Sequence, residues 1–229
     1  MRTEIFEFNG HEATVILPNY PNGKWIWKTE FLYAFDQAEQ ALVEQGYTRV
    51  YYQISDMYGS PNSVRLMRKF YHYVTEKYKL EEKCILFGFS RGGLYAFNFA
   101  LFYPEYVEKV YLDAPVLDMK TWPPKNSLEQ KQLFEEYDLN AETLKTFKRN
   151  PIDNLKEFFD LKLPTLLIAG DSDEIVPFAG NAGKMLNYCK GKGVVIKSIV
   201  KENCKHHPHS LEDVTPILDF INGNEKKRS

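Results

Sequence analysis

The sequence has few cysteines, and they form no pattern that indicates a bond or a ligand set. Cys84, Cys189 and Cys204 are the only three among 229 residues. Disulfide-held secreted domains carry many paired cysteines, and cysteine zinc sites use short, regular spacings. We therefore expect neither a disulfide scaffold nor a cysteine metal site, and the composition predicts a reducing, cytoplasmic environment.

Net charge and long apolar runs are also scarce. The formal net charge is −2, and the only basic run is EKKRS at residues 225–229, which is expected to be a solvated tail. No stretch approaches the ~18 apolar residues of a membrane span, and the first ten residues, MRTEIFEFNG, contain no apolar signal segment. We expect no nucleic-acid partner, no membrane partner and no export, and the sequence predicts no particular oligomeric state.

The order of apolar segments predicts an α/β fold. The first two, TEIFEF and HEATVILP, are joined by Asn9 and Gly10, a strong signal for an antiparallel hairpin. Later segments alternate between short apolar strands and helical patterns, which is typical of a parallel sheet covered by helices. Predicted strands cover residues 48–55, 84–89, 109–115, 164–170 and 193–200, predicted helices cover 29–44, 60–78, 92–103 and 210–223, and 19–27 is expected to be a loop.

One long segment interrupts this alternation. About fifty residues, 114–163, contain two helical patterns and the loop KTWPPKNS. This is too long for a simple crossover between neighbouring strands. We expect a small helical cap over the carboxyl edge of the sheet, where ligands bind in such folds. Apart from this insertion, residues 1–229 are expected to form a single domain, without repeats.

One serine stands at a predicted strand–helix corner. In CILFGFSRGGLYAF, at residues 84–97, Ser90 follows an apolar strand and precedes an apolar helix, with Gly88 and Gly92 two positions away on either side. A G-x-S-x-G pattern in this context is typical of a nucleophile elbow, whose crowded corner requires small residues. The backbone amide of Arg91, at the start of the helix, is expected to stabilise an oxyanion. A glycine turn with a capping serine is the structural alternative.

A serine nucleophile needs a base, and a carboxylate that orients the base. After a nucleophile elbow these follow in the chain order acid, then histidine. The segment DSDEIVP after the predicted strand 164–170 offers Asp171 and Asp173, and Asp113 at the end of the preceding strand is a third candidate. Because aspartate is also common in turns, each of the loop aspartates has a structural alternative.

Histidines are clustered near the end of the chain. Three of the five, His206, His207 and His209, lie within four positions in KENCKHHPHSLED. One of them is expected to be the catalytic base, and its neighbours are expected to be structural. A metal site is the rival interpretation, but no cysteine or acidic ligands match this spacing. We therefore expect no metal and no cofactor.

These motifs resemble those of α/β hydrolases. GFSRGG is similar to the nucleophile elbow, GDSDEIVP to the acid loop and KHHPHSLED to the histidine loop of that superfamily. The resemblance implies an α/β-hydrolase fold with helices on both faces of the sheet, and a triad of Ser90, Asp173 and His206. It extends from about residue 15 to residue 222 and includes PNGKWIWKTEF, YGSP and NPIDNL, which resemble a subgroup of esterase-like bacterial proteins.

Two departures from the superfamily pattern concern the site. The oxyanion signature HG after the third strand is absent and PNYPNG stands in its place. The second oxyanion donor is therefore expected among the backbone amides of residues 19–27, and Tyr20 is our choice because the next residue is a proline, which has no N–H. The glycine that usually precedes the catalytic histidine is replaced by Lys205, which leaves His207 and His209 as alternative bases.

The sequence therefore predicts a serine hydrolase, and first of all a carboxylic-ester hydrolase that acts on small acyl or carbohydrate-linked esters through an acyl-enzyme. Trp25 and Trp122, in predicted loops, are expected to line the substrate pocket, with structural packing as the alternative. Arg91 is expected to pair with a carboxylate such as Asp118, or else with a substrate carboxylate. A peptidase or thioesterase would use the same triad, and a non-catalytic binding protein is a further alternative.

Overall fold

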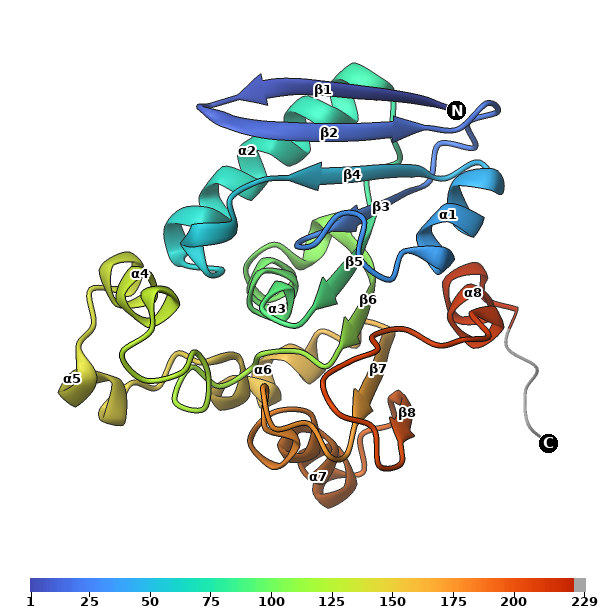
Figure 1. Cartoon of the computed structure of the whole chain (residues 1–229). Coiled ribbons are helices and arrows are strands. Elements are labelled where there is room, and N and C mark those ends of the chain that lie inside the picture. The colour runs from blue at the N-terminus through green and yellow to red at the C-terminus, as the bar shows by residue number, and fades with distance from the viewer. Residues whose placement is uncertain (225–229) are drawn as a thin grey trace.

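An eight-stranded sheet runs through the computed structural model, which describes residues 1–224 (Figure 1). The basic run at 225–229 lies outside the described residues. The strand order is β1-β2-β4-β3-β5-β6-β7-β8. The strands are β1 (Arg2–Phe8), β2 (His11–Leu17), β3 (Trp25–Lys28), β4 (Thr48–Tyr52), β5 (Cys84–Phe89), β6 (Val107–Asp113), β7 (Thr165–Gly170) and β8 (Lys197–Lys201).

The sheet is antiparallel only at its start. β1 pairs with β2 and β2 with β4 in antiparallel register, and β4, β3, β5, β6, β7 and β8 then run parallel to one another. The carboxyl ends of these parallel strands meet at one edge, which is the edge where α/β folds bind ligands. β8 is an edge strand, paired on one side only. The predicted α/β fold class, with an antiparallel beginning, is confirmed.

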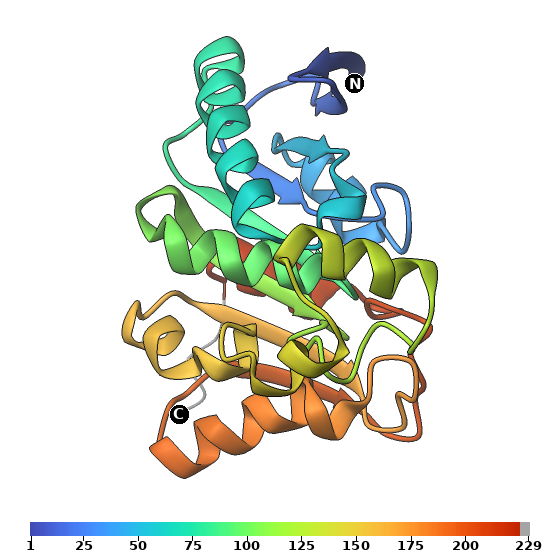
Figure 2. The same ribbon diagram turned by 90° about the vertical axis from the view of Figure 1, so that its left-hand side faces the viewer.

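Helices cover both faces of the sheet. On one face, α1 and α8 pack over a smaller apolar core that contains Ile85, Phe87 and Ile168 (Figure 1). On the other face, α2, α3, α6 and α7 cover the larger core (Figure 2). The bounds are α1 (Gln37–Glu44), α2 (Pro61–Tyr78), α3 (Gly92–Phe102), α4 (Leu128–Tyr137), α5 (Ala141–Thr146), α6 (Leu155–Asp160), α7 (Ala182–Lys192) and α8 (Thr215–Asn222), with short 3₁₀ turns η1 (Ser55–Met57), η2 (Pro104–Tyr106), η3 (Pro151–Asp153) and η4 (Phe178–Gly180).

Local sequence explains the elements that lead to the corner at residue 90. The Ser60 side chain accepts a hydrogen bond from the amide of Ser63 and Pro61 occupies the first turn of α2, so this helix begins as predicted. All six residues of β5 are buried, because the strand lies in the middle of a sheet that is covered on both faces. α3 is almost entirely buried, as expected from its predominantly apolar sequence.

The chain between residues 19 and 44 differs from the prediction. Residues 25–28, expected in a loop, form the central strand β3, in which Trp25 and Trp27 point into the larger core and Ile26 into the smaller one. The helix expected from residue 29 begins only at Gln37. The residues before it form a loop that starts at the carboxyl end of β3, and this loop reaches the site described below.

The inserted segment 114–163 contains α4, α5, η3 and α6. α6 belongs to the helical layer on the sheet, where Phe158 stacks on Phe97 of α3 at 4.2 Å between ring centroids. α4 lies further out and is held by polar contacts to the turn before α2: Tyr58 donates a hydrogen bond to Gln132 (2.7 Å) and Ser60 donates one to Glu136 (2.9 Å). α4 and α5 thus project to one side of the carboxyl edge (Figure 1).

Two further features bear on the composition-based predictions. The three cysteines are free thiols, and Cys84 and Cys189 are buried. Every helix within residues 1–224 is too short or too polar to cross a lipid bilayer.

Candidate active site

Ser90 occupies a sharp corner between β5 and α3. Its φ angle is +50°, in the left-handed region that non-glycine residues rarely adopt. Three backbone hydrogen bonds hold the corner: the Ser90 amide donates to Asp113 O (2.9 Å), and Ser90 O accepts from the amides of Gly93 (2.9 Å) and Val116 (2.8 Å). Strained conformations of this kind persist only where surrounding contacts enforce them. The strand–corner–helix geometry is that of a nucleophile elbow.

Close approach of neighbouring segments explains the glycines after the serine. A Cβ atom on Gly92 would lie 2.8 Å from the Thr29 hydroxyl oxygen, and one on Gly93 would lie 2.5 Å from the Cβ atom of Pro115. Real Cβ atoms do not approach other atoms so closely, so any larger residue would push the corner away from the loop after β3 or from the loop after β6. The predicted need for small residues here has this physical cause.

The three residues predicted as a triad lie in one hydrogen-bonded chain. Ser90 Oγ is 3.0 Å from His206 Nε2, and His206 Nδ1 is 2.7 Å from Asp173 Oδ2. All three side chains are buried. Because a carboxylate only accepts hydrogen bonds, Nδ1 carries the proton and Nε2 is left as the acceptor for the serine hydroxyl. This arrangement can transfer the serine proton to the imidazole.

The backbone of its own loop fixes the Asp173 carboxylate. Its second oxygen, Oδ1, accepts hydrogen bonds from the amides of Ile175 (3.0 Å) and Val176 (2.9 Å). The competing candidate, Asp171, is exposed, and its carboxylate accepts a hydrogen bond from the hydroxyl of Ser172. Of these two aspartates, only Asp173 contacts a histidine.

The third acid candidate pairs with a different histidine. Asp113 Oδ1 is 2.8 Å from His209 Nδ1, and its Oδ2 accepts from the Tyr111 hydroxyl (2.6 Å) and the amide of Ser210 (2.8 Å). The ring of His209 lies edge-on to that of His206, with 4.8 Å between centroids. Two aspartate–histidine pairs therefore lie side by side at the ends of β6 and β7, and only the pair of His206 reaches Ser90.

His207 is the exposed member of the histidine cluster. Its ring stacks on Phe35 with 5.7 Å between centroids and an interplanar angle of 17°. Partial burial lowers the pKa of His207, and the neighbouring His209 and His206 lower it further. No hydrogen bond within residues 1–224 joins His207 to Ser90, so its geometry does not suit a base for this serine.

The predicted second oxyanion donor is wrong for a topological reason. Tyr20 is 88% exposed and precedes β3. β3 and β5 are parallel, so the start of β3 lies at the opposite edge of the sheet from Ser90. The loop that does reach Ser90 follows β3: the Thr29 amide donates to Phe87 O (3.0 Å) and the Thr29 hydroxyl donates to Gly92 O (2.9 Å). The amide of Arg91 precedes the first turn of α3 and has no intrahelical acceptor.

The Arg91 side chain pairs with Glu30, and not with Asp118 as predicted. The guanidinium lies 3.3 Å from a Glu30 carboxylate oxygen, which also accepts a hydrogen bond from Ser55 (3.0 Å). Asp118 instead accepts a hydrogen bond from the backbone amide of Lys120. Burial raises the pKa of Glu30 in spite of Arg91, which acts in the opposite direction. The ion pair braces the loop after β3 against the elbow.

Both tryptophans predicted as pocket walls are core residues. Trp25 is completely buried in β3, stacks on Trp27 at 5.8 Å and donates a hydrogen bond to Glu81 O (2.9 Å). Trp122 is 8% exposed, and its ring lies 6.1 Å from that of Tyr58 in the larger core. Neither contributes to the cavity at Ser90, so the structural alternative holds for both.

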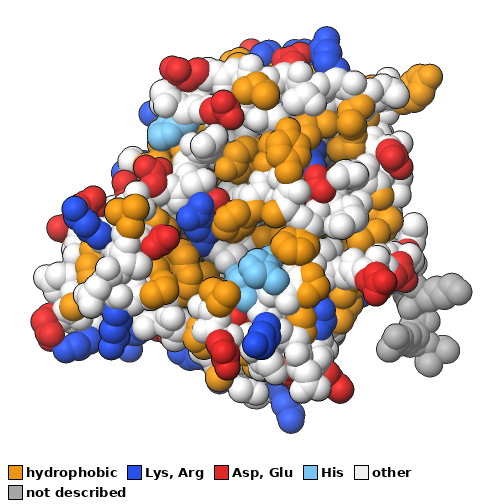
Figure 3. Space-filling model, viewed as in Figure 1, with side chains coloured by type: hydrophobic (Ala, Val, Ile, Leu, Met, Phe, Trp, Pro, Cys, Tyr) orange, Lys and Arg blue, Asp and Glu red, His pale blue; other side chains and the backbone are white. Residues whose placement is uncertain are grey.

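A cavity of about 260 Å³ opens beside the serine. Its lining is apolar and aromatic apart from Ser90 and the histidine cluster, and it contains no carboxylate, lysine or arginine. On the surface, a histidine patch near the middle of this face is bordered by hydrophobic side chains (Figure 3). The residues that line the cavity are Phe31, Ala34, Phe35, Phe89, Ser90, Ile175, His206, His207 and His209.

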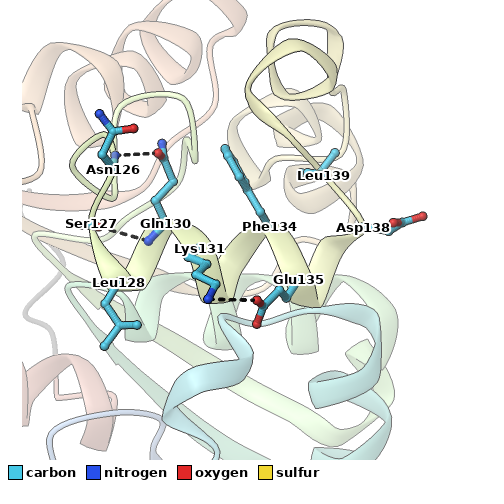
Figure 4. Close-up of a pocket in the computed structure, with 9 residues that line it drawn as sticks. All are labelled: Asn126, Ser127, Leu128, Gln130, Lys131, Phe134, Glu135, Asp138 and Leu139. Carbon is cyan, nitrogen blue, oxygen red and sulfur yellow. Dashed lines mark hydrogen bonds and ion pairs between the residues drawn. The ribbon is translucent and has the colours of Figure 1, made fainter.

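Five of these lining residues were missed as site residues: Phe31, Ala34, Phe35, Phe89 and Ile175. The spacing of Phe31 and Phe35 fits a helix, yet both have positive φ angles, +56° and +50°, and lie in the loop after β3. A second hollow, of about 690 Å³, runs along α4 and includes Gln130 and Phe134 (Figure 4). It contains none of the candidate catalytic residues.

Known structures share this fold. A protein described as a putative dipeptidyl aminopeptidase IV from Bacteroides ovatus ATCC 8483 is 15% identical, with a TM-score of 0.69, and the match covers 97% of this chain and 35% of that one. A puromycin-hydrolyzing peptidase of Mycobacterium tuberculosis is 12% identical, with a TM-score of 0.69 and coverage of 90% and 36%. MGS-MChE2, an α/β hydrolase from a sediment metagenome of the Mar Chica lagoon, Morocco, is 16% identical, with a TM-score of 0.56 and 96% coverage of both chains.

These matches confirm the α/β-hydrolase fold and, at such identities, nothing finer. The chain spans about a third of the length of each of the two peptidases. No curated protein matches the sequence. At the level of sequence, the model of the prolyl oligopeptidase family matches residues 35–227. The chain thus belongs to the prolyl oligopeptidase family.

Proposed function

We propose that the protein hydrolyses amide bonds of short peptides or related small molecules, with Ser90 as nucleophile, His206 as general base and Asp173 as the acid that orients the base. The observation that carries this proposal is the hydrogen-bonded chain from Ser90 Oγ through His206 to Asp173 Oδ2, with distances of 3.0 and 2.7 Å. A buried chain of this kind is the arrangement that activates a serine hydroxyl.

The chemistry follows from the positions of the protons. His206 Nε2 removes the Oγ proton as Ser90 attacks the substrate carbonyl carbon, and the imidazolium then donates this proton to the leaving amine. The resulting acyl-enzyme is hydrolysed by a water molecule that His206 activates in the same way. Asp173 stays ionised throughout and stabilises the imidazolium.

Backbone amides are the candidates for binding the oxyanion. The Arg91 amide, at the start of α3, has no intrahelical acceptor. We propose the amide of Phe31 as the second donor, in place of Tyr20, because Phe31 follows β3 and lines the cavity with Ser90. In comparable sites, loss of one such donor costs about 3 kcal/mol of transition-state stabilisation. The Arg91–Glu30 ion pair would hold the two donors at a constant separation.

The cavity favours a small, apolar acyl group. Phe31, Phe35, Phe89 and Ile175 supply most of its walls. An aminopeptidase needs a carboxylate to bind the free amino group of its substrate. The two carboxylates of the loop after β3 are already paired, Glu30 with Arg91 and Asp36 with Arg49. We therefore propose substrates whose cleaved bond follows a small apolar residue and which carry no charge within the cavity.

The family favours peptide amides over the esters predicted from the sequence, because it is a family of peptidases by its description. Carboxylic esters, including carbohydrate-linked ones, and thioesters remain the alternative substrates, since the same triad cleaves all of them. We further propose that α4 and α5, without α6, form the cap that was predicted for the segment 114–163, because α6 packs on α3.

A fluorophosphonate probe tests the catalytic role. We expect the wild-type protein to be labelled once per chain and Ser90→Ala to be unlabelled. Ser172→Ala removes an exposed hydroxyl next to the acid loop and is the matched control, expected to label like wild type. Absence of labelling in the folded wild-type protein would show that the site is not catalytic and would favour a binding protein.

A substrate panel then tests the bond type. Peptidyl p-nitroanilides with alanine or proline before the cleaved bond, p-nitrophenyl acetate and butyrate, and acyl thioesters are compared by kcat/KM. We expect peptide anilides with a blocked amino group to be cleaved best relative to their uncatalysed rates. Cleavage of esters alone would replace the peptidase proposal by the ester-hydrolase interpretation.

A further inference from the structure

The histidine cluster has the dimensions of a three-histidine metal site. The ring centroids of His206, His207 and His209 are 4.9, 4.8 and 5.1 Å apart in pairs. Zinc–nitrogen distances of about 2.0–2.1 Å in tetrahedral geometry place the centroids of two ligating imidazoles roughly 5 Å apart. One nitrogen from each ring lies within 4.8 Å of the other two. The separation of the ring centroids therefore fits that of three imidazoles around one zinc ion.

Two of the three imidazoles already have the hydrogen bond that metal ligands need. Nδ1 of His206 donates to Asp173 and Nδ1 of His209 donates to Asp113, at 2.7 and 2.8 Å. In zinc sites the ligating histidine usually donates its other ring N–H to a carboxylate, which fixes the tautomer and makes the free nitrogen more basic. Here both carboxylates are buried and ionisable, so they also supply negative charge behind the ligands.

The opposite nitrogens are available for a ligand. Within residues 1–224 no side chain or backbone donor bonds to Nε2 of His209 or to either nitrogen of His207, and Nε2 of His206 contacts only the Ser90 hydroxyl. His207 is exposed and can rotate about its side-chain torsions, although it is stacked on Phe35. Ligating nitrogens in a tetrahedral site lie roughly 3.4 Å apart, so the nitrogens of the three rings, which lie within 4.8 Å of one another, must move closer when an ion binds.

We propose that His206, His207 and His209 bind one Zn²⁺ ion, with water as the fourth ligand, and that the bound ion inhibits the enzyme. Imidazole nitrogens suit zinc and other late transition metals, whereas magnesium and calcium prefer oxygen. The ion takes the lone pair of His206 Nε2, so the serine hydroxyl loses its acceptor. Lys201, whose ammonium donates to Ser210 O at 3.1 Å, is a nearby cation that weakens the affinity.

The inhibition rests on the proposed role of His206 as the base, but the binding does not. Binding is therefore measured first, without reference to activity. Chelator-treated Ser90→Ala protein is titrated with ZnCl₂ by isothermal calorimetry. We expect one ion per chain and an affinity at least about tenfold lower when His207→Ala is added. His72→Ala, which removes an exposed histidine on α2, is the matched control and is expected to bind zinc as its parent does.

Equal affinities with and without His207, or the absence of saturable binding in the Ser90→Ala protein, would overturn the proposal. The second arm measures fluorophosphonate labelling of the wild-type protein during a ZnCl₂ titration. Labelling should fall as the site fills and should return on addition of EDTA, and His207→Ala should shift the half-inhibitory concentration upward at least about tenfold. Zinc that binds without slowing the labelling would contradict ligation by His206. A wild-type protein that never labels would refute the proposed function, and calorimetry would still decide whether the ion binds.

Discussion

Replacement of Asp173 by asparagine is expected to slow acylation of Ser90 about 10³–10⁴-fold. In the native protein one carboxylate oxygen accepts a hydrogen bond from Nδ1–H of His206, and the other accepts hydrogen bonds from the amides of Ile175 and Val176. An asparagine would keep its oxygen on these two amides and turn its NH₂ group toward Nδ1. Because NH₂ donates, the imidazole proton would move to Nε2, and Nε2 could no longer accept the proton of the serine hydroxyl.

The expected loss corresponds to about 4–5.5 kcal/mol of transition-state stabilisation, at 1.36 kcal/mol for each factor of ten. The measurement is the second-order rate constant of fluorophosphonate labelling, with kcat/KM on the best substrate of the panel as a second reading. Asp171→Asn is the matched control and should react at the wild-type rate, since within residues 1–224 Ser172 supplies the one side-chain hydrogen bond to that exposed carboxylate.

The neighbouring aspartate–histidine pair, Asp113 and His209, provides the test that could refute the assignment of Asp173 as the catalytic acid. Asp113→Asn weakens the hydrogen bond to His209, whose Nδ1 pairs with Asp113 and not with Ser90. It should therefore lower the free energy of unfolding by about 1.5–3 kcal/mol and the labelling rate at most about tenfold. Urea denaturation measures the first quantity. If Asp113→Asn slows labelling as much as Asp173→Asn is expected to, while Asp173→Asn leaves it near the wild-type rate, the acid has been assigned to the wrong strand end.

Other changes test the surroundings of the site. Glu39→Gln removes the carboxylate that pairs with the buried ammonium of Lys28, and it should lower the free energy of unfolding by about 3–5 kcal/mol in urea titrations. The double variant Lys28→Met and Glu39→Leu should recover most of this lost stability. A double variant as unstable as the single one would contradict the reasoning. Gly93→Ala forces the proline contact described above and should cost about 1–3 kcal/mol. Gly191→Ala, on α7 with open space around it, should stabilise by about 0.5–1 kcal/mol, and a loss there would refute the comparison. Because burial raises the pKa of Glu30 above its ordinary value of 4.5, its contribution to stability is complete below that pH and is lost as the pH rises through the raised pKa. Glu30→Gln should therefore flatten the pH dependence of unfolding as the pH rises above 4.5, and an unchanged slope would count against it.

The parts of the site that follow from local sequence could be predicted. Ser90 lies between a wholly apolar strand and a predominantly apolar helix, so its corner is visible in fourteen residues of sequence. The loops of Asp173 and His206 follow β7 and β8, and parallel strands deliver their carboxyl ends to one edge. The order of the nucleophile elbow, the acid loop and the histidine loop along the chain is then sufficient to select candidates for the catalytic acid and the catalytic base.

The wall of the cavity opposite the serine could not be predicted in the same way. β3 is only four residues long and follows a stretch rich in proline, asparagine and glycine. These turn-forming residues favoured a loop, and the short strand formed by Trp25, Ile26 and Trp27 was therefore not predicted. Once that strand was taken for a loop, the oxyanion donor was sought before it instead of after it. Phe31 and Phe35 then continued the helical spacing of α1 although their backbone is left-handed.

Pairings between distant segments were the second limit. His209 and Asp113 are 96 residues apart, and their contact depends on how the loop after β8 folds back over β6. Nothing in the spacing of three histidines tells which of them meets which aspartate. The resemblance to α/β hydrolases selected His206 and left its two neighbours as alternatives, and the distance of 3.0 Å from His206 Nε2 to the serine hydroxyl distinguishes it from them.

The position of β8 has a consequence for how the protein loses activity. A strand bonded along one margin frays at lower free-energy cost than the strands inside a sheet. The chain passes from β8 directly into the loop that carries His206, whereas Ser90 is anchored to β5 near the middle. Urea at low concentration should therefore abolish the labelling of Ser90 before it changes the fluorescence of Trp25 and Trp27, which are buried in the sheet core.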